Sequence, residues 1–206
     1  MSSFDKKSHW ENIYDTKSLN EVSWYQEKPT TSLAYIEKHA ISKDASIIDV
    51  GGGDSFLVDC LLELGYTNIT VLDISNSAIN RAKKRVGEKA KNVTWIVSDI
   101  LEFKSDTSYD FWHDRAVFHF ITNEKDIFRY KENVIAHLSD SANVVIGTFS
   151  FEGPLKCSGI EIKQYSKETL ANVFTPELSL LSSQYVDHIT PFDTIQNFVF
   201  CSFQKN

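Results

Sequence analysis

The chain has 206 residues, of which 42% are hydrophobic and 24% charged, an ordinary balance for a globular protein. This length excludes a nucleotide-binding domain followed by a separate substrate domain, and no apolar run approaches the roughly 20 residues that cross a bilayer. The formal net charge of −7 at pH 7 disfavours a nucleic-acid partner, because proteins that bind phosphate backbones usually present a basic face.

A strand, a glycine turn and a helix are predicted in succession. The β-branched run Ser46–Val50 contains Asp49 and breaks into three consecutive glycines at 51–53. An amphipathic helix is expected over Phe56–Leu64, and Gly65 closes it. A buried strand that runs through a tight turn into a helix N-terminus lets the backbone approach a nucleotide-like ligand.

The second predicted strand, Ile69–Leu72, is followed by another acid, Asp73. In α/β nucleotide-binding units, an acid at this point accepts hydrogen bonds from the ribose hydroxyls. The dinucleotide fingerprint needs a third glycine where Phe56 stands, and a phenylalanine there crowds out a diphosphate. The Walker pattern also fails, since no Gly-Lys-Ser/Thr follows the turn. The predicted ligand is therefore a nucleoside cofactor of another kind.

The turn Asp49-Val50-Gly51-Gly52-Gly53 resembles the first motif of the class I S-adenosylmethionine-dependent methyltransferases, acid-x-Gly-x-Gly-x-Gly. Ser55 replaces the last glycine and still leaves room for the ligand. The likeness continues in the family's order at Asp73-Ile74, Ser98-Asp99-Ile100, Tyr109-Asp110-Phe111-Trp112 and Val117-Phe118-His119-Phe120. Each motif alone is weak evidence, and all of them at family-like spacing predict a methyltransferase.

The resemblance implies a role at the cofactor for each matching position. The acid after the second strand binds the ribose, and the apolar residue beside it covers one adenine face. The acid after the third strand accepts the adenine amino group, and backbone at the end of the fourth strand holds the amino-acid end. The expected cofactor-binding residues are Asp49, Gly51, Gly52, Gly53, Asp73, Ile74, Asp99, Ile100 and His113.

The implied fold is a seven-stranded, mostly parallel α/β sheet with helices on both faces and a C-terminal antiparallel hairpin, the Rossmann-like methyltransferase fold. Alternating strands and helices independently favour a doubly wound sheet. Asn123 and Ser166 are expected to cap helices, with a loop over Ser150–Gln164, and the basic run Arg81–Arg85 is interpreted as a solvated helix face. Strands are expected near Ser46–Val50, Ile69–Leu72, Val93–Val97, Asp110–Trp112, Asn143–Phe149, Ser179–His188 and Gln196–Phe203.

Residues 43–206 are expected to form the cofactor-binding core of a single domain, preceded by a helical cap or lid over residues 1–42. In the family this segment often folds over the cofactor, and here it concentrates aromatic residues, Trp24 and Tyr25 among them. Hydrophobic docking of two short helices on the sheet would use the same residues. An aromatic lid would suit a cationic acceptor through cation–π attraction, or equally a flat aromatic one.

The methyl group is expected to point at His113-Asp114-Arg115. Asp114 is the candidate catalytic residue, because it could orient an amine or take its proton, and a structural ion pair or helix cap is the alternative. Arg115 could pair with a carboxylate or phosphate, and His119 is expected to be a partly buried, hydrogen-bonded histidine rather than a base. The expected substrate pocket comprises Trp24, Tyr25, Asp114, Arg115, Phe118 and Lys156.

These expectations describe an enzyme that uses S-adenosylmethionine, releases S-adenosylhomocysteine and methylates a small molecule by in-line displacement. Methylation of a protein lysine is the main alternative, a cofactor-binding protein without transferase activity is the second, and a nicotinamide-dependent reductase is remote. An enclosed pocket would favour the first, a surface groove the lysine, and a blocked site the absence of catalysis. Three cysteines without metal-ligand spacing predict no metal site and a reducing, cytoplasmic location.

Overall fold

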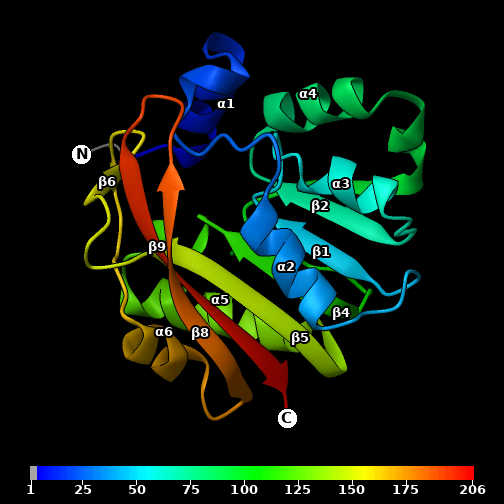
Figure 1. The fold of residues 1–206 in the computed structure, drawn as a ribbon, viewed down its shortest axis with the longest axis vertical. Helices are drawn as coiled ribbons and strands as arrows, with labels where there is room; N and C mark the ends of the chain where they lie inside the picture. Colours follow the sequence, from blue (N-terminus) through cyan, green and yellow to red (C-terminus); the bar gives the residue numbers. More distant parts are fainter. Residues whose placement is uncertain (1–3) are drawn as a thin grey trace.

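A seven-stranded sheet forms the centre of the computed structural model, which describes residues 4–206 (Figure 1). Its order is β3 (Val93–Val97), β2 (Ile69–Asp73), β1 (Ile47–Val50), β4 (Tyr109–Arg115), β5 (Leu138–Phe149), β9 (Ile195–Lys205) and β8 (Leu178–Ile189). Neighbours from β3 to β5 pair in parallel, whereas β9 runs antiparallel to both β5 and β8. The predicted doubly wound sheet with its C-terminal hairpin is confirmed.

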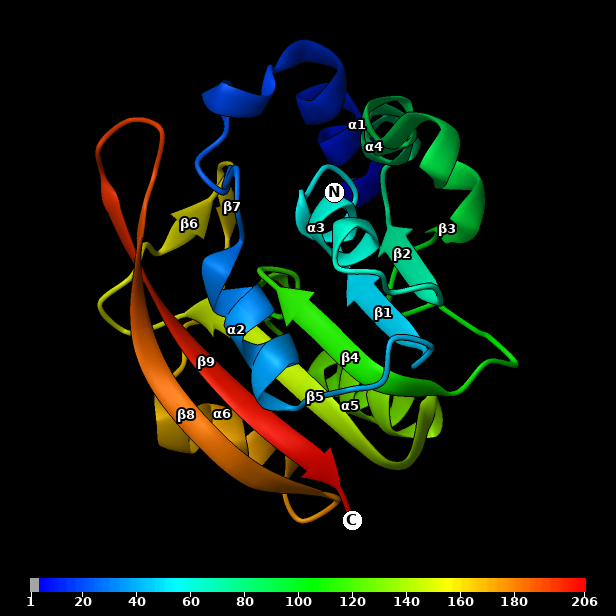
Figure 2. The same cartoon turned by 45° about the vertical axis from the view of Figure 1, so that its right-hand side comes forward.

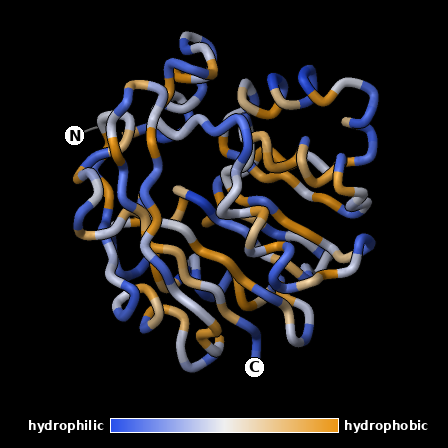
Figure 3. Tube along the Cα trace, viewed as in Figure 1, coloured by the Kyte–Doolittle hydropathy of each residue, from blue (hydrophilic) through white to orange (hydrophobic). Residues whose placement is uncertain are grey.

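Helices cover both faces of the sheet, since each has one apolar stripe to bury. One face packs against α2 (Thr30–Lys38), α3 (Leu57–Glu63) and α4 (Asn76–Val86), and the other packs against α5 (Glu124–Ala136) and α6 (Lys167–Phe174) (Figure 2). Neighbouring residues of β4 show the alternation, because Phe111 and Trp112 are both fully buried but in different cores. Hydrophobic colouring accordingly follows the central strands in Figure 3.

The two expected helix caps are confirmed. The Asn123 side chain accepts a hydrogen bond from the Asp126 amide, and the Ser166 hydroxyl accepts one from the Thr169 amide. Each satisfies an amide that the first turn of a helix leaves without a partner. Two short helical turns, η2 (Gly87–Asn92) and η3 (Phe118–Phe120), join elements of the core, and no helix within residues 4–206 is long and apolar enough to cross a membrane.

Three segments differ from expectation. β4 runs on to Arg115, and β5 begins at Leu138, where the polar residues Ser139–Ser141 hid its first part from a pattern based on apolar residues. The expected loop over Ser150–Gln164 contains a small hairpin, β6 (Lys156–Cys157) and β7 (Ile160–Glu161). The extension of β4 matters most, because the side chains of residues 113–115 then point alternately to the two faces of the sheet.

The N-terminal segment contributes α1 (Lys6–Thr16) and η1 (Leu19–Glu21), and α1 lies beside α4 (Figure 1). Residues 1–3 of the expected cap lie outside the described residues. The Glu11 carboxylate accepts hydrogen bonds from Ser75 Oγ at 2.7 Å and from the amides of Asn76 and Ser77 at 2.9 Å each, at the start of α4. Nearer the C-terminal end of α1, Arg81 Nη1 donates to the Tyr14 carbonyl at 2.9 Å. The middle and the last turn of α1 are thus fastened to α4.

Candidate active site

A cavity opens at the carboxyl edge of the sheet, between the strand ends and the N-terminal segment. Its walls come from the glycine turn after β1, the ends of β2, β3 and β4, the segment around α1 and η1, and the residues of η3 and just after it. Its empty volume, which includes open solvent at the mouth, is ≈ 1330 Å³. The cavity lies where open α/β sheets bind their ligands, outside the carboxyl ends of the strands.

The cavity brings together the residues expected at the cofactor. All of them line it except Gly53, whose amide instead donates to Asp73 Oδ2 at 3.0 Å. Asp99 follows β3, and its Oδ1 accepts a hydrogen bond from the Leu101 amide at 2.9 Å. The lining residues from this set are Asp49, Gly51, Gly52, Asp73, Ile74, Asp99, Ile100 and His113.

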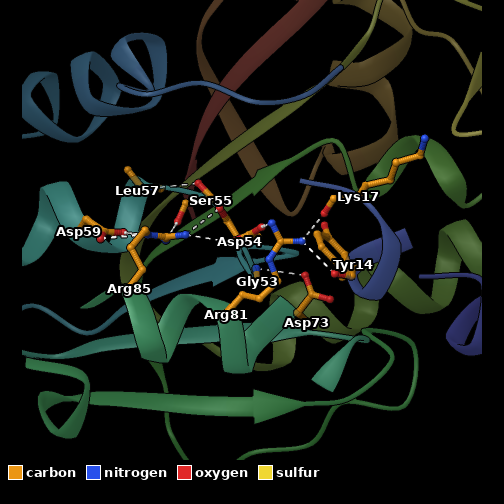
Figure 4. A network of polar contacts seen from close by, with 10 residues as sticks. All are labelled: Tyr14, Lys17, Gly53, Asp54, Ser55, Leu57, Asp59, Asp73, Arg81 and Arg85. Carbon is orange, nitrogen blue, oxygen red and sulfur yellow. Dashed lines mark hydrogen bonds and ion pairs between the residues drawn. The ribbon is translucent and has the colours of Figure 1, made fainter. Parts of the chain in front are cut away.

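Asp73 is buried at the end of β2, and backbone amides hold both of its oxygens. Besides the Gly53 contact (Figure 4), Oδ1 accepts from the Ser75 amide at 2.8 Å. Burial raises the pKa of Asp73 to about 7, against the opposing effect of these amides. Each carboxylate oxygen has a further lone pair, so the group can accept hydrogen bonds from a pair of hydroxyls while it fixes the glycine turn.

Asp49 and His113 face each other on adjacent strands, β1 and β4. Asp49 Oδ1 accepts a hydrogen bond from His113 Nδ1 at 2.7 Å, and the other ring nitrogen, Nε2, lies 2.8 Å from Ser32 Oγ on α2. The second oxygen, Asp49 Oδ2, is buried without a protein partner among the described residues. A buried, unpartnered carboxylate oxygen in a cavity wall suits a cationic donor such as an ammonium group.

Two independent structural features require glycine at position 51. Its φ is +69°, in the left-handed region that side chains disfavour, and a Cβ placed on it would lie 2.0 Å from Val117 Cγ2. Its amide donates to the Leu72 carbonyl at 2.7 Å, which ties the turn to β2. The sequence attributes this glycine to close approach by a ligand, but packing against the turn after β4 already requires it.

An ion-pair network holds the far side of the glycine turn (Figure 4). The buried Asp54 carboxylate pairs with Arg81 Nη2 at 3.1 Å and with Arg85 Nη1 at 2.8 Å. Arg85 also pairs with Asp59 at 2.8 Å, and its guanidinium lies 4.1 Å over the Phe56 ring. The expectation that Arg81 and Arg85 belong to a solvated face is wrong, because α4 turns both toward the turn and α3.

Three residues expected in the substrate pocket lie elsewhere. Asp114 is fully buried on the α5 side of β4, where it accepts from the Val117 amide at 2.9 Å and from the Tyr130 hydroxyl. Phe118 packs fully buried in the same core. Lys156 is exposed, 3.7 Å from Glu161 across the β6–β7 hairpin. Strand alternation is the physical reason for Asp114, since His113 and Arg115 take the cavity side. None of the three lines the cavity, so Asp114 is corrected to a residue that holds the turn after β4.

The remaining expected pocket residues, Trp24, Tyr25 and Arg115, do line the cavity. They are joined by aromatic residues that the sequence did not single out as site residues. The Trp10 ring centroid lies 5.3 Å from that of Phe120 and 5.6 Å from that of Trp24. Tyr14, one helical turn after Trp10, lies 6.2 Å from Trp24. This i, i+4 spacing on α1 is the only signal that could have paired Trp10 with Tyr14.

The sequence predicts a partly buried, hydrogen-bonded His119, but the residue is fully buried and neither ring nitrogen has a hydrogen-bond partner among the described residues. Its ring centroid lies 4.5 Å from those of Phe120 and Phe149. Burial, together with the Arg115 charge, lowers the pKa of His119 to about 3, so the imidazole is neutral near pH 7. Within residues 4–206, no group of three His, Cys, Asp or Glu side chains is placed to hold a metal ion.

A family model described as "Methyltransferase domain" matches residues 41–195. Human EEF1A lysine methyltransferase 2 is 24% identical over 191 residues, which cover 87% of this chain and 77% of that protein. Malonyl-[acyl-carrier protein] O-methyltransferase of Bacillus cereus is 32% identical over 138 residues, 66% of this chain. The matched segment covers 49% of the Bacillus protein, so the match reaches only about half of that relative.

A solved structure gives the same fold in complex with ligands. The 1,6-didemethyltoxoflavin-N1-methyltransferase of Burkholderia thailandensis, with 1,6-didemethyltoxoflavin and S-adenosylhomocysteine bound, aligns with a TM-score of 0.76. The alignment covers 97% of this chain and 87% of that one, at 17% sequence identity. At this identity the likeness shows the fold alone.

Proposed function

This chain belongs to the class I S-adenosylmethionine-dependent methyltransferases, and on that premise we propose that it methylates a small molecule. The cofactor is S-adenosylmethionine, which supplies an activated methyl group when bound. The observation that carries the proposal is the aromatic wall of the cavity, in which Trp10, Tyr14 and Trp24 of the N-terminal segment meet Phe120. Such a wall surrounds a small acceptor better than it fits a folded protein surface.

At the part of the cavity formed by the ends of β1, β2 and β3, here called the cofactor end, each acidic residue suits one group of S-adenosylmethionine. Asp73 has lone pairs free for the ribose hydroxyls, and Asp99 lies after β3 where the adenine amino group is expected. The unpartnered Asp49 Oδ2 suits the ammonium of the amino-acid end. His113 orients Asp49 through its hydrogen bond and is itself held by Ser32.

These residues contribute alignment and water exclusion rather than proton transfer. Asp114 points away from the cavity, and His119 is a neutral imidazole without a partner. Holding donor and acceptor in line can supply about 7–11 kcal/mol of a barrier, so a transfer to an unprotonated nucleophile needs no dedicated base. We therefore propose no catalytic acid or base for this site.

The test separates acceptors by size. The protein is incubated with S-adenosylmethionine labelled in its methyl group and a cell extract divided into dialysable and macromolecular fractions. Label is expected in dialysable molecules, and Asp73→Asn, which weakens the proposed ribose contact, should transfer far less at the same enzyme concentration. Label confined to macromolecules would overturn the small-molecule proposal.

Transfer to a protein lysine is the second candidate, and the similarity to human EEF1A lysine methyltransferase 2 over 87% of this chain favours it. It predicts label in the macromolecular fraction that survives dialysis and maps to lysine after hydrolysis. It also predicts that bulky substitutions at the mouth of the cavity block transfer to proteins.

A reducing, cytoplasmic location is proposed on separate grounds. Cys60, Cys157 and Cys201 are all free thiols, and the last two are buried. Unpaired buried thiols are typical of proteins from reducing compartments. Fractionation of cells that express the tagged protein would test this location.

A further inference from the structure

Arg115 is a cation without a counter-ion in the part of the cavity where Trp24 meets Trp10 and Phe120, which we call the acceptor end. A guanidinium has five N–H donors, and the protein acceptor found for this one is the Trp24 carbonyl, 3.2 Å from Nη1. Nη2 is shielded from solvent and has no hydrogen-bond partner in the described part of the chain. No carboxylate of residues 4–206 lies within ion-pair distance of Arg115.

No group around Arg115 pairs with it directly, although the nearby Asp49 charge favours its protonated form. Its guanidinium lies 4.9 Å over the Phe198 ring, and Phe198 packs against Phe149 with ring centroids 4.7 Å apart. Cys157 also lines the cavity, and burial raises the pKa of its thiol to about 12, so it stays uncharged near pH 7. Burial likewise lowers the pKa of Arg115 to about 10, which leaves the guanidinium protonated at neutral pH.

The position of Arg115 in the sheet separates it from the nucleoside end. It closes β4 opposite Gly147 of β5, and Gly147 is opposite Phe200 of β9. Asp73 and Asp99 lie on the other side of β1, at β2 and after β3. A ligand group at Arg115 is therefore on the β4 side of the cavity, away from Asp73 and Asp99.

We propose that Arg115 binds a carboxylate of the acceptor, so that the substrates of this enzyme are small organic acids. This inference rests on the proposed small-molecule methyltransferase function. A carboxylate presents two coplanar oxygens to the guanidinium fork and carries a single charge. Lys6 is the only other lysine or arginine that lines the cavity within residues 4–206, so the cavity wall carries few cations for a phosphate dianion.

The test titrates the purified full chain, saturated with S-adenosylhomocysteine, with acetate and with its uncharged isostere acetamide. Acetate is small enough to reach the site whatever the shape of the natural acceptor. The wild type is expected to bind acetate saturably and not to bind acetamide. Broadening of the carbon-13 resonance of the ligand measures the binding. In Arg115→Met the acetate affinity should fall about tenfold or more, because a charge-assisted bidentate pair is lost.

Arg129→Met is the matched control, since Arg129 is a half-exposed arginine paired with Glu102 at 2.8 Å on the surface. It should bind acetate like the wild type, and Arg115→Lys should fall between the wild type and Arg115→Met. Equal acetate binding by the wild type and Arg115→Met, or none by a wild type that binds S-adenosylhomocysteine, would overturn the inference alone. Failure of the wild type to bind S-adenosylhomocysteine would instead overturn the proposed function.

A parallel titration distinguishes the two carboxylates that Arg115 could bind, that of the acceptor and that of S-adenosylmethionine. Arg115→Met should bind S-adenosylmethionine and its decarboxylated analogue with the same small change, because the acceptor, not the cofactor, contacts Arg115. A loss of affinity for S-adenosylmethionine alone would assign Arg115 to the carboxylate of the cofactor and overturn the assignment to the acceptor.

Discussion

The two ends of the cavity are built differently. At the cofactor end, short turns that follow β1, β2 and β3 carry the polar groups, and neighbouring backbone amides hold Asp73 and Asp99. At the acceptor end, Trp10 and Phe120 come from distant parts of the chain, and Arg115 retains a donor without an acceptor. Local structure therefore holds Asp73 and Asp99 at the cofactor end, although Asp49 Oδ2 there still has no protein partner among the described residues, whereas packing between distant segments builds the acceptor end.

The strongest test of a pre-built cofactor end is Gly51→Ala. The variant adds a Cβ at positive φ and against Val117, so we expect a loss of about 2–4 kcal/mol in the free energy of unfolding, measured by urea denaturation. Gly65→Ala is the matched control, because Gly65 also has positive φ but nothing within 4 Å of the added Cβ. It should lose only about 1 kcal/mol. Equal losses would show that the contact with Val117 is unimportant.

Asp73→Asn tests the cofactor end of the cavity by its effect on ligand affinity. Asparagine keeps one acceptor oxygen but loses the charge, so the affinity for S-adenosylhomocysteine should fall by about 1.5–3 kcal/mol in calorimetric titration. Unchanged affinity would show that the ribose binds elsewhere.

The pH dependence of that affinity sharpens the prediction. Because the pKa of Asp73 is raised to about 7, protonation below pH 7 removes an acceptor, and wild-type affinity should weaken between pH 8 and pH 6. The Asp73→Asn variant has no proton to gain there and should show a nearly flat profile. A wild-type profile that is flat over the same range would contradict this assignment.

Asp114→Asn tests the difference between Asp114, which faces the core, and its neighbour Arg115 on β4, which faces the cavity. Burial raises the pKa of Asp114 from 3.8 to about 6, so its contribution to stability is complete below pH 3.8 and is lost as pH rises through 6. Relative to the wild type, the free energy of unfolding of the variant should rise by on the order of 1–2 kcal/mol between pH 4 and pH 7. Urea denaturation at several pH values measures this change. Methyl transfer should change little; a large loss of turnover in a stable variant would return Asp114 to the acceptor.

The smallest expected effect concerns how the N-terminal segment is held over the acceptor end. Burial opposes ionisation of Glu11, but hydrogen bonds from Ser77, Ser75 and Asn76 hold its pKa at about 2. Glu11→Gln should cost about 0.5–1 kcal/mol and speed amide exchange over α1.

The control for Glu11 is Glu21→Gln, whose carboxylate accepts only within its own turn, from the Ser18 amide at 2.8 Å. It should leave exchange over α1 unchanged. Because the pKa of Glu11 is depressed in the folded chain, its contribution is present above pH 4.5 and is lost as pH falls toward 2. Exchange that is equally fast in both variants would show that Glu11 does not fasten α1.

Most of the sheet was predictable because its signals are local. The apolar runs, the caps at Asn123 and Ser166 and the two long C-terminal runs each depend on neighbouring residues, and the structure confirms them. The error at Asp114 has an equally local origin. The expected strand stopped at Trp112, so residues 113–115 were treated as one loop facing the methyl group, although β4 continues through Arg115 and alternates their side chains.

The sequence by itself determined the family, the cofactor and the succession of strands along the chain, because a glycine turn and acids at strand ends are contiguous patterns. Only the tertiary structure decided which side chains share the acceptor end. That choice depends on how α1 docks on α4, which face of β4 each residue takes and where β9 inserts, and these are contacts between residues far apart in the chain. Arg115 without a carboxylate, Asp49 with a free oxygen and Trp10 against Phe120 are products of that packing.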